Sequence, residues 1–207
     1  MLWRGWLRIT LALTGRLSRL RERLATSSRP TDDDSALLWA AVAVVLTPDP
    51  ESLLLIRRAE RAGDPWSGHM ALPGGRREPR DHDLLATVVR ETSEEVGITL
   101  SPQHLAGTLE DVVPRTPVLP PIAVRPFVFF PPTRPQLVLN QEISAARWIS
   151  LDELLSPEAH HPVQLHLGGL SRKVQAYELG DAIIWGMTER ILTNLLLHVQ
   201  HQRLPAP

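Results

Sequence analysis

The chain has 207 residues, enough for one domain with a sizeable hydrophobic core and some added segments. Its 22 basic and 23 acidic residues give a formal net charge of −1, which excludes the strongly basic balance of a non-specific nucleic-acid binder. Cysteine is absent, so disulfides and thiolate metal sites are excluded, as is typical of the reducing cytoplasm. We therefore expect a cytoplasmic protein without a specific nucleic-acid partner.

Residues 1–26 are predicted to form a basic amphipathic helix. Apolar residues at helical spacing share one face, and arginines gather on the other: Leu2, Trp6, Ile9, Leu13, Leu17, Leu20 and Leu24 against Arg4, Arg8, Arg19 and Arg23. The apolar stretches are too short to span a bilayer, and no signal-peptide cleavage pattern follows them. Three interpretations stay open: packing on the domain or on a second subunit of a homodimer, peripheral membrane contact, or a targeting extension.

Residues 27–35 are polar and turn-forming, so we interpret them as a linker. The main domain is predicted at residues 36–201, followed by a tail at 202–207. Alternating and continuous apolar runs predict strands at 36–46, 52–57, 107–113, 122–130 and 145–150, and helices at 84–96 and 185–201. Strands at both ends with helices between them predict an α+β sandwich.

The segment that precedes the closing helix is predicted to be mostly loop. It carries three histidines, His160, His161 and His166. Their spacing matches no firm template for a metal site, so we interpret them as structural or exposed.

The helix at 84–96 combines an apolar stripe with a cluster of charges. Its core-facing positions are Leu85, Val88, Val89, Thr92 and Val96. Asp81 or Asp83 can accept hydrogen bonds from the first free amides of the helix. Gly97 can end the helix in the left-handed conformation.

Glu91 and Glu95 lie four residues apart on one flank of that stripe, with Glu94 beside them. Like charges at this spacing repel, and the last helical turn disfavours anions. A solvated face is one interpretation, and a bound divalent cation that offsets the repulsion is the other. Carboxylate oxygens suit Mg²⁺ or Mn²⁺, which commonly binds one or two carboxylates together with substrate phosphates. Arg90 can pair with a neighbouring glutamate and fix its rotamer.

A Pro-Gly-Gly turn that contains Gly74 and Gly75 precedes the helix. Glycine allows a close approach to the backbone that side chains would block. Most Gly-Gly pairs only form turns. This pair indicates a binding site only because it lies at a fixed distance in sequence from the glutamates. Together they predict a place where a phosphate and a metal meet.

These residues resemble the signature of the Nudix hydrolases, in which a glycine is followed at a distance by Arg-Glu, two residues, Glu-Glu, one residue and Gly. The matching positions are Gly75, Arg90, Glu91, Glu94, Glu95 and Gly97. Two departures stand out: Asp81 or Asp83 replaces the usual intermediate glutamate, and the spacing from Gly75 to Arg90 is one residue longer. The resemblance implies an α/β/α sandwich with a mixed β-sheet.

The longer spacing is similar to that of the coenzyme A diphosphatase branch of the family. An upstream motif of that branch is matched by Leu54, Leu55, Arg58, Gly68, Pro73, Gly74 and Gly75. Ile56, Ala59 and Leu72 depart from it, where the branch usually has Thr, Ser and Phe. The closing "IIWGMTERIL" also resembles the final helix of that branch.

The resemblance implies hydrolysis of a diphosphate bond, with Glu91, Glu94 and Glu95 as ligands of Mg²⁺ or Mn²⁺. The general base is left open among Glu91, Glu94 and the distant Glu142. For Glu142 the alternative interpretation is a solvated loop residue. Arg90 supports the cluster, and the residues expected near substrate are Arg57, Arg58, Arg61, His69, Gly74 and Gly75.

The implied substrate is a nucleoside-diphosphate-linked compound, with coenzyme A or its thioesters first. Dinucleotides, ADP-sugars and nucleoside triphosphates come next. The alternative from another class is a catalytically silent Nudix-fold module that binds a nucleotide, a partner or a membrane. Such a module would be free to lose the carboxylates, and this sequence keeps all three.

Overall fold

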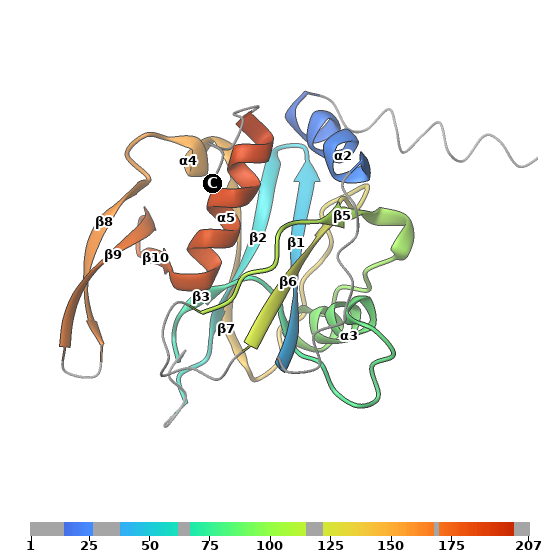
Figure 1. Ribbon diagram of the computed structural model, residues 1–207, viewed down its shortest axis with the longest axis horizontal. Helices are drawn as coiled ribbons and strands as arrows, with labels where there is room; N and C mark the ends of the chain where they lie inside the picture. The colour runs from blue at the N-terminus through green and yellow to red at the C-terminus, as the bar shows by residue number, and fades with distance from the viewer. Residues whose placement is uncertain (1–14, 27–37, 62–66, 115–121, 168–169, 201–207) are drawn as a thin grey trace, which may run out of the picture.

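A seven-stranded mixed sheet forms the centre of the protein (Figure 1). The computed structural model describes residues 15–26, 38–61, 67–114, 122–167 and 170–200. The strands run in the order β3-β2-β1-β6-β5, with β4 also paired to β1 and β7 to β2. Among the described strands of this sheet, β1 and β6 pair in parallel and the other pairs are antiparallel. The bounds are β1 Leu38–Pro48, β2 Glu51–Arg58, β3 Met70–Ala71, β4 Gly74–Arg76, β5 Leu105–Thr108, β6 Ile122–Phe129 and β7 Ile143–Ser150.

Two hydrophobic clusters cover the two faces of this sheet. Successive side chains of a strand point to opposite faces, and the central strands supply alternate residues to each cluster. On β2, for example, Leu54 and Ile56 join the cluster around helix α3 (Leu84–Val96), whereas Leu53 and Leu55 join the cluster around helix α5 (Gly186–Gln200). The sheet is therefore enclosed between helices, which confirms the predicted α+β sandwich.

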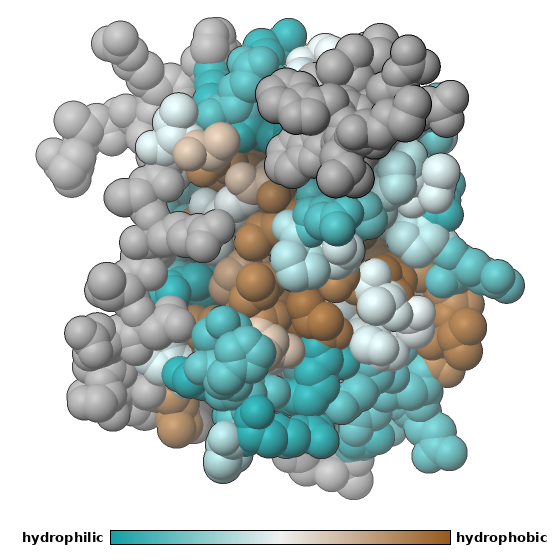
Figure 2. Space-filling model, turned by 90° about the vertical axis from the view of Figure 1, so that its right-hand side faces the viewer, coloured by the Kyte–Doolittle hydropathy of each residue, from teal (hydrophilic) through white to brown (hydrophobic). Residues whose placement is uncertain are grey.

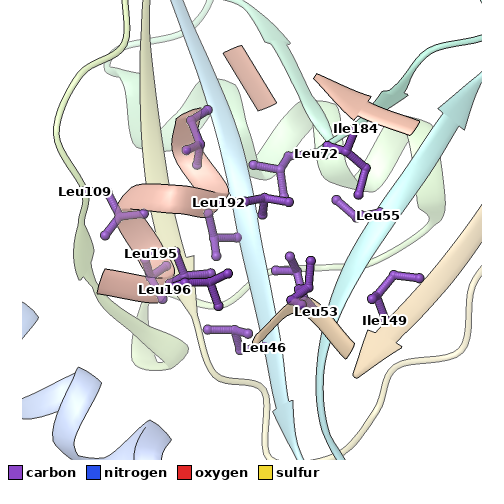
Figure 3. Packing of buried hydrophobic residues seen from close by; sticks show 14 of the residues in the cluster. Leu46, Leu53, Leu55, Leu72, Leu109, Ile149, Ile184, Leu192, Leu195 and Leu196 are labelled. Atoms are coloured by element: carbon purple, nitrogen blue, oxygen red, sulfur yellow. The ribbon is translucent and has the colours of Figure 1, made fainter. Parts of the chain in front are cut away.

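Helix α5 packs on its face of the sheet through a row of leucines (Figure 3). Leu192, Leu195 and Leu196 lie close to Leu46 and Leu53 of the first two strands, and Leu192 and Leu195 are fully buried. The predicted helix at 84–96 is confirmed as α3 with the same bounds. The short helix α4 (Leu151–Leu155) and the 3₁₀ turn η1 (Pro102–His104) complete the helical elements of the described residues that follow β1.

Helix α2 (Arg16–Thr26) is the described part of the N-terminal segment and packs on the domain. Its apolar positions Leu17, Leu20 and Leu24 are buried in the same cluster as α5. Arg16 pairs with Glu51 and Asp152, at 2.6 and 2.7 Å. The apolar face of this part is therefore already covered by the protein itself. Residues 1–14 of the predicted helix lie outside the described residues.

Truncating Leu20 tests whether α2 belongs to the cooperative fold. We expect Leu20→Ala to lower the free energy of unfolding by about 2–4 kcal/mol, because a fully buried leucine leaves a cavity. The exposed Arg19 on the same helix is the matched control, and Arg19→Ala should change that free energy by less than about 0.5 kcal/mol. Urea denaturation measures both, and equal midpoints for the two variants would show that α2 is a separate appendage.

A second, three-stranded sheet corrects the predicted loop before α5. Its strands are β8 His160–Leu167, β9 Leu170–Leu179 and β10 Ala182–Trp185, in the order β10-β9-β8. The β8–β9 hairpin projects from one side of the molecule (Figure 1). Pro162 within β8 argues against a strand, and the polar residues of β9 hide the alternation, which is why the sequence pattern missed this sheet. The three histidines therefore lie on a strand.

The other predicted strands differ only at their ends. β5 ends at Thr108, earlier than the predicted strand at 107–113, and Val112 makes an isolated bridge to Val124. β7 begins two residues before the predicted strand at 145–150. Residues 36, 37 and 201, at the ends of predicted elements, lie outside the described residues.

The face that carries α2, β5 and α3 exposes hydrophobic side chains in its middle, bordered by polar ones (Figure 2). Among the described residues, Leu38, Val113, Val138 and Leu139 are the large hydrophobic residues with exposed side chains. Within the described part of the chain, every helix is too short or too polar to cross a lipid bilayer.

Candidate active site

The ends of α3 are fixed by residues directly beside it in the sequence. Asp83 is the N-cap: its Oδ1 accepts a hydrogen bond from the Ala86 amide at 2.7 Å. Gly97 ends the helix at φ 73°, and its amide donates to the Ser93 carbonyl at 3.1 Å. Of the two aspartates considered from the sequence, Asp83 therefore caps the helix.

Asp81 has a different role, as the buried partner of Arg90. Arg90 donates from Nε to Oδ1 at 3.0 Å and from Nη2 to Oδ2 at 2.9 Å. Oδ2 also accepts hydrogen bonds from the Glu78 amide and the Thr87 hydroxyl. The Arg90 guanidinium, with these donors, holds the pKa of Asp81 well below its usual range, although burial acts in the opposite direction. Of the two aspartates considered from the sequence, Asp81 is therefore the one that binds Arg90.

The remaining nitrogen of Arg90 holds two of the three glutamates. Nη1 donates to Glu91 Oε1 at 2.9 Å and to Glu94 Oε2 at 3.1 Å. Glu94 also pairs with Arg80 and has a side chain that is 47% exposed. Arg90 therefore pairs with neighbouring glutamates, as expected from the sequence. Glu94 lies at the exposed edge of the cluster.

Glu95 is the buried member of the trio, with only 2% of its surface exposed. Its Oε2 accepts a hydrogen bond from the Gly74 amide at 2.8 Å. Burial raises the pKa of Glu95 to about 8, and the charges of Glu91 and Glu142 act in the same direction. The Gly74 hydrogen bond and the charge of Arg58 act in the opposite direction. The site therefore disfavours the ionised carboxylate unless a positive charge joins it.

Glu91 lies against Gly75 at the same turn. A Cβ at position 75 would lie 2.5 Å from the carboxylate carbon of Glu91, so only glycine leaves room for this side chain. Burial raises the pKa of Glu91, whereas the adjacent Arg90 lowers it. Because β4 pairs with β1, the turn is fixed to the central sheet next to the two glutamates.

The two glycines of the turn should respond differently to alanine. In Gly75→Ala the new methyl meets a side chain that can move, so we expect a folded protein whose kcat falls by about 10²-fold as Glu91 is displaced. In Gly74→Ala the methyl would overlap the backbone of Ala41, at a φ of 146° that disfavours a side chain, so we expect loss of soluble folded protein.

Circular dichroism and turnover of the two purified variants check this pair of outcomes. Full activity of Gly75→Ala would contradict the placement of Glu91 over the turn.

The donor set fits a hard divalent cation. No three acidic or histidine side chains of the described residues form a ready-made metal cage, and Arg90 supplies the positive charge next to Glu91 and Glu94. Mg²⁺ does not need such a cage, since it keeps several waters and uses one or two carboxylates together with substrate phosphates. Glu95 and Glu91 are the carboxylates that a cation would stabilise, because both have raised pKa values.

Glu142 lies within electrostatic range of Glu95, as its effect on the Glu95 pKa shows. The Glu142 carbonyl accepts a hydrogen bond from the Ala59 amide at 2.7 Å, and its side chain pairs with Arg61 at 3.0 Å. Asn140, a residue that the sequence patterns did not single out, donates its amide to the Glu95 carbonyl at 3.1 Å. The structure thus brings a loop that is distant in sequence to the end of α3.

The other predicted substrate residues separate into two groups. Arg58 lies near enough to lower the pKa of Glu95. Arg57, its neighbour, pairs instead with Asp181 at 3.0 Å in the second sheet. The His69 ring packs edge-on against Trp185, with ring centroids 5.0 Å apart. The structure therefore places Arg58 with the glutamates, and Arg57 with the second sheet.

Comparison with known proteins agrees with this geometry. The NUDIX domain model matches residues 37–167. The uncharacterized Nudix hydrolase NudL of Yersinia pestis is 31% identical over 159 residues, which cover 76% of this chain and 77% of that protein. An uncharacterized protein of Schizosaccharomyces pombe is 41% identical over 118 residues, which cover 55% of this chain but only 36% of the yeast protein.

A solved MutT/nudix family protein from Enterococcus faecalis has the same fold, with a TM-score of 0.57 at 17% identity over 97% of this chain and 76% of that chain. The chain therefore belongs to the Nudix family. Nudix hydrolases cleave diphosphate bonds in nucleoside diphosphate derivatives and generally use divalent metal ions. The sequence-based assignment to this family is confirmed.

Proposed function

We propose that this protein is a Mg²⁺- or Mn²⁺-dependent hydrolase of the diphosphate bond in a nucleoside-diphosphate-linked compound, with coenzyme A or its thioesters as the first candidates. The observation that carries the proposal is the burial of Glu95 against the Gly74 amide, beside Glu91 over Gly75. A buried carboxylate with a pKa near 8 has a cost for folding, and a cation bound with substrate offsets it.

The residues of the chain have distinct tasks in this proposal. Glu91 and Glu95 would hold the metal, and Glu94, at the exposed edge of the cluster, would add charge to it. A bound Mg²⁺ or Mn²⁺ supplies charge neutralisation of the diphosphate and lowers the pKa of a bound water. Arg90, fixed by Asp81, orients Glu91, and Arg58 adds positive charge on the substrate side. Positioning and electrostatics provide most of the rate in such phosphoryl transfers.

We assign the general base to Glu142, which takes the proton of the attacking water. Its position near Glu95 and outside α3 supports this choice over Glu91 and Glu94, which Arg90 holds. Among the described residues, Arg61 donates to Oε1 of Glu142 at 3.0 Å, and Oε2 is the oxygen that we propose as the proton acceptor.

The preference for coenzyme A is supported by sequence features, namely the motif from Leu54 to Gly75 and the closing helix. Of that motif, Arg58 lowers the pKa of Glu95, and Gly68 has a φ of 74° in the turn before β3. Arg57 and His69 remain proposed substrate contacts, and both would have to leave their present partners in the second sheet to reach a phosphate.

Incubating the purified protein and Mg²⁺ with a panel of diphosphate compounds tests this function, with products identified by mass. We expect coenzyme A to yield 4′-phosphopantetheine and adenosine 3′,5′-bisphosphate. Preferential cleavage of dinucleotides, ADP-sugars or nucleoside triphosphates would show that the protein belongs to a different substrate class of the family. Binding without turnover across the whole panel would instead identify a silent Nudix module.

A further inference from the structure

The segment from Val138 to Glu142 links the metal-binding helix to the proposed base. At its start, the amides of Val138 and Asn140 donate to the carbonyls of Val96 and Glu95, at 2.9 and 3.1 Å. These are carbonyls of the last helical turn, which has no partners of its own within the helix. The segment therefore lies along the end of α3 in a defined register.

The Asn140 side chain connects this segment to Glu142. Its Oδ1 accepts a hydrogen bond from the Glu142 amide at 2.8 Å, an Asx-type turn in which a side chain takes the place of a backbone acceptor. The same residue therefore contacts the main chain of Glu95 through its amide and the main chain of Glu142 through its side chain.

Glu142 is held from the other side by the end of β2. Its carbonyl accepts from the Ala59 amide, and its carboxylate pairs with Arg61. The pairing of β2 with β7 shifts register between Arg57 and Arg58, which leaves Ser144 as the extra residue of a bulge two positions after Glu142. Bulges of this kind re-aim side chains beside active sites.

We propose that Asn140 is a positioning residue that fixes Glu142 relative to Glu95, and so sets the distance between the base and the metal ligands. This inference rests on the proposed function, in which Glu142 is the base. An alanine at 140 keeps the backbone bond to Glu95 and removes only the side-chain acceptor for Glu142. A base displaced by about 1 Å can cost 10²-fold in rate.

The test is a double-mutant cycle on the full chain, with the best substrate of the panel. We expect Asn140→Ala to lower kcat by about 10–100-fold with KM and the Mn²⁺ dependence unchanged, because it acts through another residue. Asn140→Asp keeps an oxygen acceptor and should recover part of the rate. The exposed neighbour Gln141 gives the control, and Gln141→Ala should match the wild type.

If Asn140 acts through Glu142, the double variant Asn140→Ala/Glu142→Gln should be no slower than Glu142→Gln alone. A multiplicative loss in the double variant, or wild-type kcat in Asn140→Ala, would overturn the inference.

Amide hydrogen exchange gives a second readout that does not depend on turnover. The Glu142 amide should be protected in the wild type and lose at least tenfold in protection in Asn140→Ala. Equal exchange in both would also overturn the inference, whereas an inactive wild type with this loss of protection would count only against the proposed function.

Discussion

Glu95→Gln should abolish metal-dependent hydrolysis and at the same time make the metal-free protein more stable at alkaline pH. Removing groups that merely support a metal ligand costs 10–100-fold, so loss of the ligand itself should exceed about 100-fold. Glutamine keeps a carbonyl oxygen that can accept the Gly74 amide hydrogen bond, so the fold should survive.

The gain in stability follows from the raised pKa of Glu95. A carboxyl group that titrates at about 8 in the folded protein, against 4.5 without the fold, contributes full stability below about pH 4.5. That contribution is lost as the pH rises through 8, and it amounts to a few kcal/mol. The glutamine side chain does not ionise, so the variant escapes this loss.

Urea denaturation in the presence of a chelator, from pH 5 to pH 9, measures the difference between the two proteins. We expect it to be small at pH 5 and to grow to a few kcal/mol in favour of Glu95→Gln by pH 9. Added Mg²⁺ should then stabilise the wild type but not the variant. A difference that does not change with pH would show that Glu95 is not buried as the structure has it.

Asp81→Asn should cost both stability and activity, because it breaks a buried ion pair. Arg90 would lose its most buried charged partner but keep Glu91 and Glu94, so we expect a loss of about 1.5–3 kcal/mol, the cost of hydrogen bonds to a charged group. The freed guanidinium would no longer orient Glu91, so kcat should fall by about 10–100-fold. Thermal or urea unfolding and steady-state kinetics measure the two effects.

Asp83→Asn is the matched control, since asparagine is as good an N-cap as aspartate and Asp83 does not bind Arg90. It should change stability by less than about 0.5 kcal/mol. The pH dependence gives a further check: a lowered pKa makes Asp81 stabilising above pH 3.8, with that contribution lost as the pH falls towards the lower folded value. Similar acid sensitivity in Asp81→Asn and the wild type would contradict the role of this pair.

The parts of the site that the sequence predicted are those set by short-range geometry. The helix at 84–96, its glycine end and the shared flank of Glu91 and Glu95 follow from a 3.6-residue period and local caps. The proximity of the Pro-Gly-Gly turn to the glutamates could be inferred from the family signature, although its contact with Glu95 depends on the pairing of β4 with β1.

The parts that it did not predict depend on contacts between distant segments. Arg57 and Arg58 are neighbours in sequence, yet strand alternation sends them to opposite faces, and the partner of Arg57 is Asp181. The choice between Asp81 and Asp83 depends on how the turn folds back on Arg90. No sequence pattern pointed to Asn140. Its role depends on the hydrogen bonds that it makes to Glu95 and Glu142, and these can be seen only in the folded structure.

The central claim is that Glu91 and Glu95 bind a divalent metal over the Gly74–Gly75 turn, and Mn²⁺ titration followed by electron paramagnetic resonance tests it most directly. We expect saturable Mn²⁺ binding to the wild type, weakened more than about 100-fold in Glu95→Gln and unchanged in the distant, exposed control Glu158→Gln. Equal Mn²⁺ affinity in all three proteins would contradict the account.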